Sequence, residues 1–406
     1  MKVGIASSTE KSAIRNGQQV ASRAMSAGKL DHAHLVLAFC TPDIDHTAFY
    51  KGLRMVVGPQ PPIVGGSAVG IITNSEICFQ GSAAGVMIIE SNELRFHVAS
   101  ADHIDEDEAN AGRSLALSLP DDPEAQLMLI FYDSIRIPGD AKNPPLMNAS
   151  PPLIQGIQGA LKAQVPILGA GVLGDLDFMP TYQFCGYHVG QQSVAGLLMT
   201  GAFKYYWRIM HGCTPLNGIY HTITRAHGAV LYEVDNRPIV SLIDELYGSS
   251  DWQNQRPVKR LTIGVNYGEK FADFDENSFV NRLIAGVLPR QEGIVMFEPD
   301  LSEGTEIMFM LRDAYEMIRS SKENTAALME QIRQEGAKPV CAFYIDCAGR
   351  AARFSETITE EASEIVSILN RSQTPLLGFY SGVEIAPLLG QSRGLDWTGI
   401  LLILAR

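Results

Sequence analysis

Residues 62–70 read PIVGGSAVG, and this stretch decides the fold because the chain repeats its pattern twice. Residues 166–174 read PILGAGVLG, and residues 375–382 read PLLGFYSG. Each stretch contains Pro-x-x-Gly and is flanked by apolar runs of strand length. Self-similarity of this kind indicates an internal repeat with three copies.

An apolar run precedes each glycine stretch and another follows it. A helical pattern separates the first run from the glycine stretch, so each copy reads as β-α-β followed by two further strands. First strands that are apolar throughout favour central positions in a sheet buried on both faces. We therefore predict an α/β fold with mixed sheets from three diverged β-α-β-β-β units, with the glycine stretches as turns. The preceding runs are Leu35–Cys40 and residues 127–132 and 340–344; the following runs are residues 84–89, 195–199 and 398–403.

The chain of 406 residues is long for one core, so two domains are expected. Residues 1–205 hold two repeat units, and residues 206–406 hold a region of different pattern and then the third unit. That region is expected to contain two strand pairs with a helix between them: residues 222–226 with 229–234, then 239–247, then 293–297 with 305–311.

Composition excludes several classes of protein. The net charge is −13 and no basic run occurs, which argues against binding to nucleic acid. No apolar stretch has the length of a membrane span, and the N-terminus lacks a signal-peptide pattern. The six cysteines are scattered without a CxxC pair, as is usual in a reducing compartment. A cytoplasmic protein that binds neither membrane nor nucleic acid is expected.

Motifs for catalysis are weak. Residues 169–174 fit GxGxxG, but a dinucleotide site needs a helix to begin in that turn, and a poor helix sequence ending in Pro180 follows. No GxSxG, phosphate-binding loop or HExxH pattern occurs. Cys347 has no histidine beside it to act as a base. We expect a binding protein rather than an enzyme.

Several of these segments resemble the FIST family, an intracellular signal-transduction module with N- and C-terminal parts. The resemblance implies a sensor of small molecules such as amino acids, acting on a signalling partner such as a histidine kinase. Some bacterial members are described as haem-based nitric oxide sensors. One departure is Gly382-Val383-Glu384-Ile385, where the family usually has Gly-Glu-Ile after the tyrosine. The matching segments are residues 62–67, 212–215, 222–226, 233–238, 346–350 and 378–385.

The predicted ligand site is a cleft between the two parts, with most of its residues in the third unit. Arg350 is the first candidate because its guanidinium fork matches a carboxylate. The alternative is a structural turn in which Arg350 bonds main-chain carbonyls or a carboxylate such as Glu384. The candidate ligand-binding residues are Arg350, Tyr380, Glu384, Cys347, Gly65, Gly66, Ser67 and Arg225.

Two other functions stay open at this point. No cofactor is expected on the leading interpretation, and no paired Cys/His spacing indicates a metal. A haem would need one axial histidine beside an apolar slot, and His188 and His221 are the candidates. A scaffold that recruits partners without a ligand is the third interpretation.

Overall fold

Each predicted unit folds into a mixed sheet with two helices on one face, and each is longer than predicted because a further strand and helix precede it. The computed structural model describes residues 1–79, 81–138, 145–175 and 178–406. The α/β class and the mixed sheets are confirmed, since the sheet of each unit combines parallel and antiparallel pairs. Within these ranges no helix is long and apolar enough to cross a membrane.

The first two units follow one another along the chain. The first contains β1 (Lys2–Ser8), α1 (Ala13–Gly28), β2 (Leu35–Cys40), α2 (His46–Val57), β3 (Ile63–Ser67), β4 (Ile71–Thr73), β5 (Ile77–Cys78) and β6 (Ala84–Glu90). The second contains β7 (Leu94–Asp102), α3 (Glu108–Ser118), β8 (Ala125–Asp133), β9 (Ile135–Ile137), β10 (Leu146–Met147), α4 (Ser150–Ala160), β11 (Ile167–Val172), β12 (Gln183–Cys185), β13 (His188–Gly190) and β14 (Ser193–Gly201).

The third unit is interrupted after its first strand by an inserted region. The unit contains β15 (Lys204–Met210), α6 (Ala314–Gln334), β25 (Pro339–Cys347), a 3-10 turn (Ala348–Arg350), α7 (Ala352–Ser355), α8 (Ala362–Arg371), β26 (Leu376–Ser381), β27 (Val383–Leu388), β28 (Gln391–Leu395) and β29 (Gly399–Ala405). The insert contains β16 (Cys213–Pro215), β17 (His221–His227), β18 (Val230–Val234), β19 (Arg237–Pro238), α5 (Ile239–Tyr247), β20 (Leu261–Asn266), β21 (Phe279–Arg282), β22 (Ile284–Val287), β23 (Ile294–Met296) and β24 (Glu306–Arg312), with 3-10 turns at Asp251–Asn254, Glu276–Ser278 and Pro289–Gln291.

The prediction that the Pro-x-x-Gly stretches form turns is wrong, because they are the strands β3, β11 and β26. Each pairs in parallel with the strand before it in its unit. A Cβ atom added at Gly65 would lie 2.0 Å from the carbonyl oxygen of Ala38, and one at Gly169 would lie 1.9 Å from that of Ile130. The backbones approach too closely for a side chain, which explains the glycine at this position.

The three sheets exchange hairpins in a ring. The first sheet has the order β1-β6-β2-β3 and is completed by β12-β13 of the second unit. The second, β7-β14-β8-β11, is completed by β27-β28 of the third unit, and the third, β15-β29-β25-β26, by β4-β5 of the first. The predicted boundary at residues 205/206 falls within β15, the first strand of the third unit.

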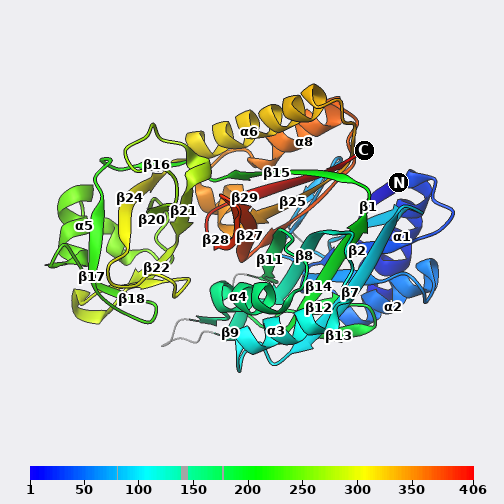
Figure 1. Cartoon of the computed structure of the whole chain (residues 1–406), viewed down its shortest axis with the longest axis horizontal. Coiled ribbons are helices and arrows are strands. Elements are labelled where there is room, and N and C mark those ends of the chain that lie inside the picture. Colours follow the sequence, from blue (N-terminus) through cyan, green and yellow to red (C-terminus); the bar gives the residue numbers. More distant parts are fainter. Residues whose placement is uncertain (80, 139–144, 176–177) are drawn as a thin grey trace.

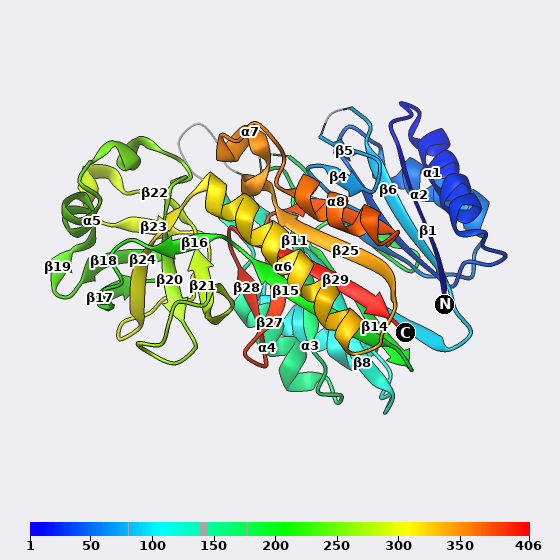
Figure 2. The ribbon, with the colours of Figure 1, turned by 90° about the horizontal axis from the view of Figure 1, so that it is seen from above.

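The inner faces of the three sheets share one apolar core. Phe39 stacks on Phe379 with ring centroids 4.0 Å apart, and Phe131 meets Phe39 edge-on at 5.2 Å. The outer face of each sheet is covered by a helix pair: α1 and α2, α3 and α4, or α6 and α8. Figure 1 shows these pairs on three sides of the molecule, and Figure 2 shows α6 and α8 side by side over the third sheet.

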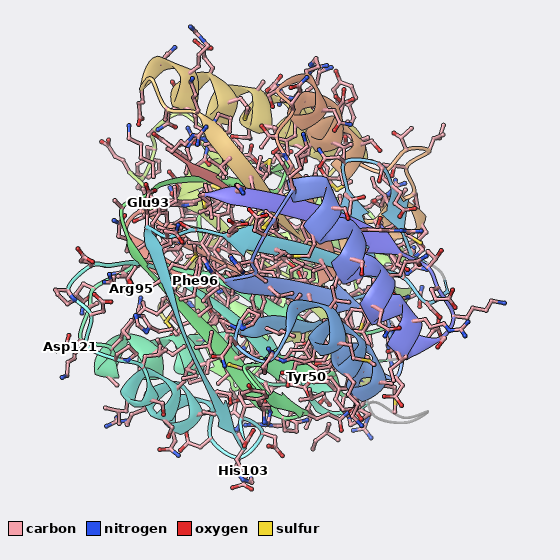
Figure 3. The ribbon with its side chains drawn as sticks, turned by 90° about the vertical axis from the view of Figure 1, so that its right-hand side faces the viewer. Tyr50, Glu93, Arg95, Phe96, His103 and Asp121 are labelled. Carbon is pink, nitrogen blue, oxygen red and sulfur yellow. The ribbon has the colours of Figure 1, made fainter. Side chains whose placement is uncertain are left out.

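The first helix pair and an edge strand are seen together in Figure 3. Tyr50 of α2 lies beside Gly186 of the β12–β13 hairpin, whose carbonyl accepts hydrogen bonds from Tyr50 and Arg54. Phe96 lies on the edge strand β7 and packs against the shared core, while Arg95 of the same strand pairs with Asp122. The alternation of Phe96 and Arg95 is that of a half-buried strand.

The inserted region has its own sheet and core. Its predicted first strand pair and helix are confirmed as β17, β18 and α5. The second predicted pair is wrong, because β23 pairs with β18 and β22 while β24 pairs with β20, β17 and β16. The turn between them therefore connects two strands that are not neighbours. Figure 1 shows this region at the end of the molecule opposite α1 and α2.

Candidate functional site

Arg350 lies in a buried ion network beyond the carboxyl end of β25. Its Nε donates to Asp346 Oδ1 at 2.8 Å, and its Nη2 lies 3.1 Å from Glu361 Oε2. Its Nη1 donates to the carbonyl oxygens of His211 and Trp397. All three nitrogens thus have protein partners, which is the geometry of a structural turn. That Arg350 contacts a ligand stays a prediction. Such a contact would require Arg350 to give up some of these hydrogen bonds for bonds to the ligand.

The ion network contains more carboxyl groups than cations. Burial and the nearby Glu361 raise the pKa of Asp346 well above its usual range, and Arg350 opposes this shift. Glu361 also accepts hydrogen bonds from Ser321 and Tyr344. The cluster is therefore a closed structural element in which Arg350 offsets the burial of the carboxyl groups around it.

Three further predicted residues, Glu384, Cys347 and Tyr380, are buried beside this network. Glu384 accepts a hydrogen bond from Ser381 Oγ at 2.8 Å, and the Tyr380 hydroxyl donates to Glu360 at 3.2 Å. Burial raises the pKa of Glu384 and of the Cys347 thiol well above their usual ranges. A thiol whose pKa is raised above its usual value stays protonated at neutral pH, and a neutral thiol is a poor nucleophile.

Gly65, Gly66 and Ser67 lie in β3 of the first sheet, whereas Arg350 lies in the 3-10 turn that follows β25 of the third sheet. The Ser67 Oγ lies 2.9 Å from Nε2 of His46 and accepts a hydrogen bond from the main-chain N–H of Tyr182. Burial lowers the pKa of His46 to about 4, so its imidazole is neutral. The structure therefore joins this segment to α2 and the loop before β12.

Arg225 and His188 lie outside the ion network as well. Arg225 is on β17 of the insert, 55% exposed, paired with Glu233 and placed over the Tyr232 ring at 4.7 Å. His188 is on β13, 3.4 Å from a carboxylate oxygen of Asp102. The predicted residues thus form one cluster around Arg350 and separate groups elsewhere.

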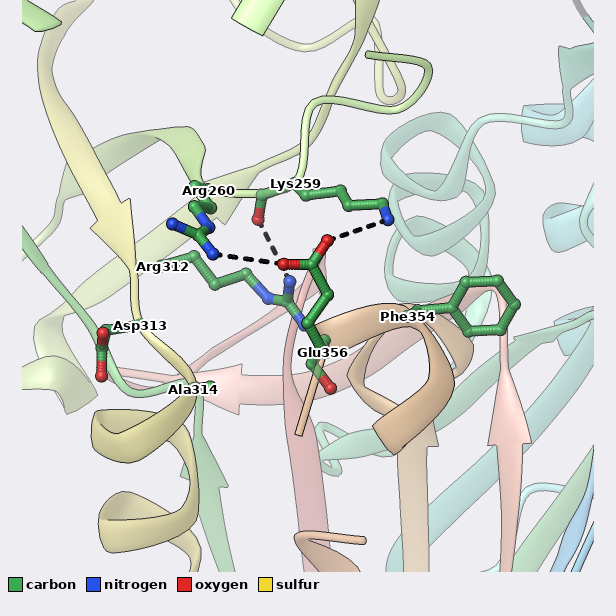
Figure 4. Close-up of a pocket in the computed structure, with 8 residues that line it drawn as sticks. Lys259, Arg260, Arg312, Asp313, Ala314, Phe354 and Glu356 are labelled. Carbon is green, nitrogen blue, oxygen red and sulfur yellow. Dashed lines mark hydrogen bonds and ion pairs between the residues drawn. The ribbon is translucent and has the colours of Figure 1, made fainter. Parts of the chain in front are cut away.

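An open pocket lies where the insert meets the third unit, next to the buried network (Figure 4). Its volume is about 160 Å³. It touches the network directly, because Ser355 of its wall donates a hydrogen bond to the Arg350 carbonyl. This is the arrangement expected of a ligand site at a joint between two parts of a chain. The lining residues are Lys259, Arg260, Arg312, Asp313, Ala314, Phe354, Ser355 and Glu356.

Three elements bring the charged side chains of this pocket together. Lys259 and Arg260 precede β20, which pairs with β24, and Arg312 ends β24. Asp313 then caps α6 by accepting hydrogen bonds from two amides of its first turn. Glu356 follows α7 in the left-handed region, with φ of 59°. A strand end, a helix start and a tight turn thus meet at one place.

Glu356 bridges two cations across the pocket, as Figure 4 shows. Its carboxylate lies 3.4 Å from Lys259 Nζ and 3.2 Å from Arg260 Nη2. Arg312 is buried, with its guanidinium 4.2 Å from the ring centroid of Trp397. It donates to the carbonyl oxygens of Lys259 at 3.1 Å and Gly349 at 2.7 Å. Two cations of the insert, Lys259 and Arg260, therefore hold one exposed carboxylate of the third unit.

A second depression of about 330 Å³ lies along the first half of α6. Its deepest carboxylate, Glu276, accepts hydrogen bonds from the amides of His211 and Gly212 and from the side chains of Ser320 and Asn324. Those donors already satisfy Glu276, so this depression offers a ligand less than the first pocket does.

A third polar cluster joins the insert to the second unit. Glu298 accepts a hydrogen bond from the Ser150 amide at 3.2 Å, and its other oxygen has no partner. Asp396 accepts from the Leu283 amide at 2.7 Å, and Arg282 pairs with Asp300. Burial first, then the charge of Asp396, raises the pKa of Glu298 to about 8. Glu298 is therefore mostly protonated at neutral pH.

The pocket residues were missed at the sequence level. Arg312 and Asp313 stand at a strand-to-helix junction, where Asp reads as an ordinary helix cap. The adjacent cations Lys259 and Arg260 were the available signal, because a basic pair directly before the apolar residues of β20 marks a positive edge. Glu356 stands 97 residues beyond Lys259 and only the fold brings them together.

Comparison with solved structures finds chains of similar extent and remote sequence. A cyanuric acid hydrolase from A. caulinodans is 9% identical, with 99% of this chain and 98% of that chain covered and a TM-score of 0.33. A chorismatase is 9% identical, with both chains covered over their full length and a TM-score of 0.30. These scores are too low to support an argument about activity. No curated protein matches the sequence.

Family comparison covers most of the chain. Residues 34–237 match the FIST N domain, and residues 240–387 match the FIST C domain. The pocket residues from Lys259 to Glu356 all fall within the second match. The chain therefore belongs to the FIST family of signal-transduction sensory domains.

Proposed function

We propose that this protein is a small-ligand sensor whose ligand binds in the pocket between the insert and the third unit. The observation that carries the proposal is an open cavity lined by charged side chains from both parts. A ligand that contacts both parts favours the arrangement in which they are close, and a change of arrangement is what a partner can read. The partner we propose is a cytoplasmic signalling protein such as a histidine kinase.

The pocket suits binding better than catalysis. Ser355 is the hydroxyl residue of its lining, and its Oγ donates to the carbonyl oxygens of Arg350 and Ala351. No lining residue is a histidine or cysteine that could act as its base or as a second nucleophile. We therefore propose a sensor without enzymatic activity and without a resident cofactor.

Cavity size limits the ligand. An apolar cavity of about 150 Å³ holds benzene, so a pocket of about 160 Å³ holds a molecule of similar bulk. Small amino acids have this size, and their charged groups match a lining that carries both signs of charge. Amino acids are therefore the first class to test.

The test is thermal unfolding of the protein in the presence of single amino acids and other small polar metabolites. A ligand at one hundred times its Kd stabilises by about 2.7 kcal/mol, which is readily measured as a rise in Tm. The Arg260→Ala variant should lose this rise, while Arg237→Ala, which removes an exposed arginine elsewhere on the insert, should keep it. A Tm that no compound raises, or a rise that survives in Arg260→Ala, would refute the proposal.

One observation favours the haem alternative. His221 is buried on β17, its Nδ1 lies 2.7 Å from Asp235, and its Nε2 has no hydrogen-bond partner among the residues that the structure describes. A carboxylate on one imidazole nitrogen fixes the other as a lone-pair donor, as in metal-ligating histidines. His221 would hold haem iron through Nε2, and haem would supply a site for a diatomic gas such as nitric oxide. The geometry at His188 is less suitable, because its Nε2 lies 3.3 Å from Ser193 Oγ and 3.4 Å from Asp102.

Reconstitution with haem separates the two functions. A Soret band that shifts on addition of nitric oxide, lost in His221→Ala and kept in His188→Ala, would support the alternative. Protein that leaves the spectrum of free haem unchanged would exclude it.

A further inference from the structure

Arg312 is a buried cation without a carboxylate partner. Its side chain is 7% exposed, and its hydrogen bonds go to two main-chain carbonyls and the Met317 sulfur. Among the described residues no ion pair includes Arg312, and its Nε has no partner. A buried charge without a counter-charge is costly, so a built-in partner is the usual arrangement. Here the open pocket stands beside the guanidinium instead.

The pocket as a whole has an excess of positive charge. Lys259, Arg260 and Arg312 carry three positive charges, while Asp313 and Glu356 carry two negative ones. The Asp313 carboxylate is engaged as the cap of α6. If the Glu356 carboxylate moves out of the pocket, three positive charges and the one negative charge of Asp313 remain. The net charge of the lining is then +2.

Glu356 has the properties of a replaceable occupant. Its side chain is 56% exposed, and its distances to Lys259 and Arg260, 3.4 and 3.2 Å, are those of loose ion pairs. Its neighbour Ile358 is fully exposed, so little packing holds this turn. Exposed ion pairs of this kind contribute little to stability, and exchange for a better anion costs little.

We infer that the pocket binds a doubly charged oxyanion group, which pairs with Arg312, Arg260 and Lys259 and displaces the carboxylate of Glu356. The inference rests on the proposed function and names the ligand chemistry of the same site. Guanidinium and ammonium groups around one anion are the usual means of binding phosphate or carboxylate oxygens. Displacement of Glu356 frees the turn after α7, so the same event that fills the pocket changes the surface next to it.

The test measures the affinity of the full chain for inorganic phosphate and for malonate by calorimetry at pH 8, with chloride holding the ionic strength constant. Glu356→Gln removes the internal competitor without changing the size of the side chain. If Glu356 occupies the site about nine-tenths of the time, its removal should strengthen dianion binding about tenfold. Glu330→Gln on α6, which removes an exposed carboxylate paired with Arg333, is the matched control and should bind as the wild type does.

Arg260→Gln, at an exposed position, should weaken binding of both anions at least tenfold, and Arg312→Met should abolish it. A preference for phosphate over malonate would identify a phosphoryl ligand, and the reverse a dicarboxylate. Equal affinities in wild type and Glu356→Gln, or an affinity that Arg260→Gln does not lower, would overturn the inference. If amino acids bind in an Arg260-dependent manner while both dianions do not, the inference fails and the proposed function stands; if nothing binds, both fail.

Discussion

Two buried arginines of the third unit and its insert differ in one respect. Arg350 is surrounded by Asp346, Glu361 and two carbonyl oxygens, and all of its nitrogens have partners. Arg312 is nearly as buried, but within the described part of the chain it meets carbonyl oxygens, a sulfur and an aromatic ring, and no carboxylate. Arg350 faces the protein interior, whereas Arg312 lines an open pocket.

The partners of a buried arginine therefore distinguish a residue that stabilises the fold from one that is available to a ligand. A buried charge whose partners are all within the chain contributes to the fold, and its removal leaves those partners unpaired. A buried charge that has no counter-charge among the described residues and lines a cavity is arranged for a ligand that comes from outside. The motif residue Arg350 thus supports the site, and Arg312, which belongs to no motif, forms it.

The largest effect should come from breaking the paired arginine. Arg350→Met should lower the free energy of unfolding by about 3–5 kcal/mol, because Asp346 and Glu361 lose their buried cation. Denaturant unfolding followed by circular dichroism measures this. A loss below 1 kcal/mol would show that the paired network is not structural and would remove the contrast with Arg312.

A second effect concerns the other buried charge cluster, at Glu298. The pKa of this residue is raised from 4.5 to about 8 in the folded state, so the folded protein holds its proton more tightly than the unfolded chain does. The stabilisation is fully present below about pH 4.5 and is lost as the pH rises through 8. Between pH 7 and pH 9 the loss should be about 1.4 kcal/mol. In Glu298→Gln this part of the pH dependence should disappear, and an unchanged profile would contradict the assignment.

Replacing Arg312 should lower the free energy of unfolding less than either Arg350→Met or the rise in pH from 7 to 9. Arg312→Met should change the free energy of unfolding by about 1 kcal/mol or less without ligand, since lost hydrogen bonds are offset by relief of an uncompensated buried charge. Unfolding in dianion-free buffer, beside Arg350→Met, gives the comparison directly. Equal losses in the two variants would mean that both arginines are structural.

The smallest effect is expected at Cys347. Its thiol is buried and its pKa is raised well above the usual range, so iodoacetamide should leave it unmodified in the native protein at pH 8. Cys78, which is partly exposed, should be the first cysteine modified, as peptide mass spectrometry can show. Rapid modification of Cys347 would mean that the region around Arg350 opens.

Sequence patterns predicted the repeat and the α/β class because the Pro-x-x-Gly strands are locally distinctive. The strand that opens each unit was missed, and so was α1, which is polar along much of its length. Its Gly17 approaches the backbone of α2 too closely for a side chain, a contact that no local pattern shows. The exchange of hairpins between units could not be predicted from the sequence either, because two short strands do not indicate which sheet they will join.

Site residues were harder to predict for a related reason. Cys347 and Arg350 come at the end of an apolar strand and were predicted to bind a ligand, but Ser321 of α6 and Glu361 at the start of α8 cover Arg350. The burial of Arg350 therefore depends on helices that are distant in the sequence. Arg312 belongs to no sequence motif. That no carboxylate pairs with it among the described residues is visible only once its neighbours in the fold are known.

The ring of exchanged hairpins affects whether parts of the chain could be exchanged between proteins in evolution, and when the fold can form during translation. Each sheet takes its last two strands from another unit, so no unit can leave without exposing an edge on one neighbour and losing its own closing strands. The two family domains named from sequence are thus halves of one cooperative body rather than modules that could be shuffled separately. Because β27 and β28 close the second sheet, and β4 and β5 pair with the sheet of the last strands, a nascent chain cannot complete its second and third sheets until the final unit has left the ribosome.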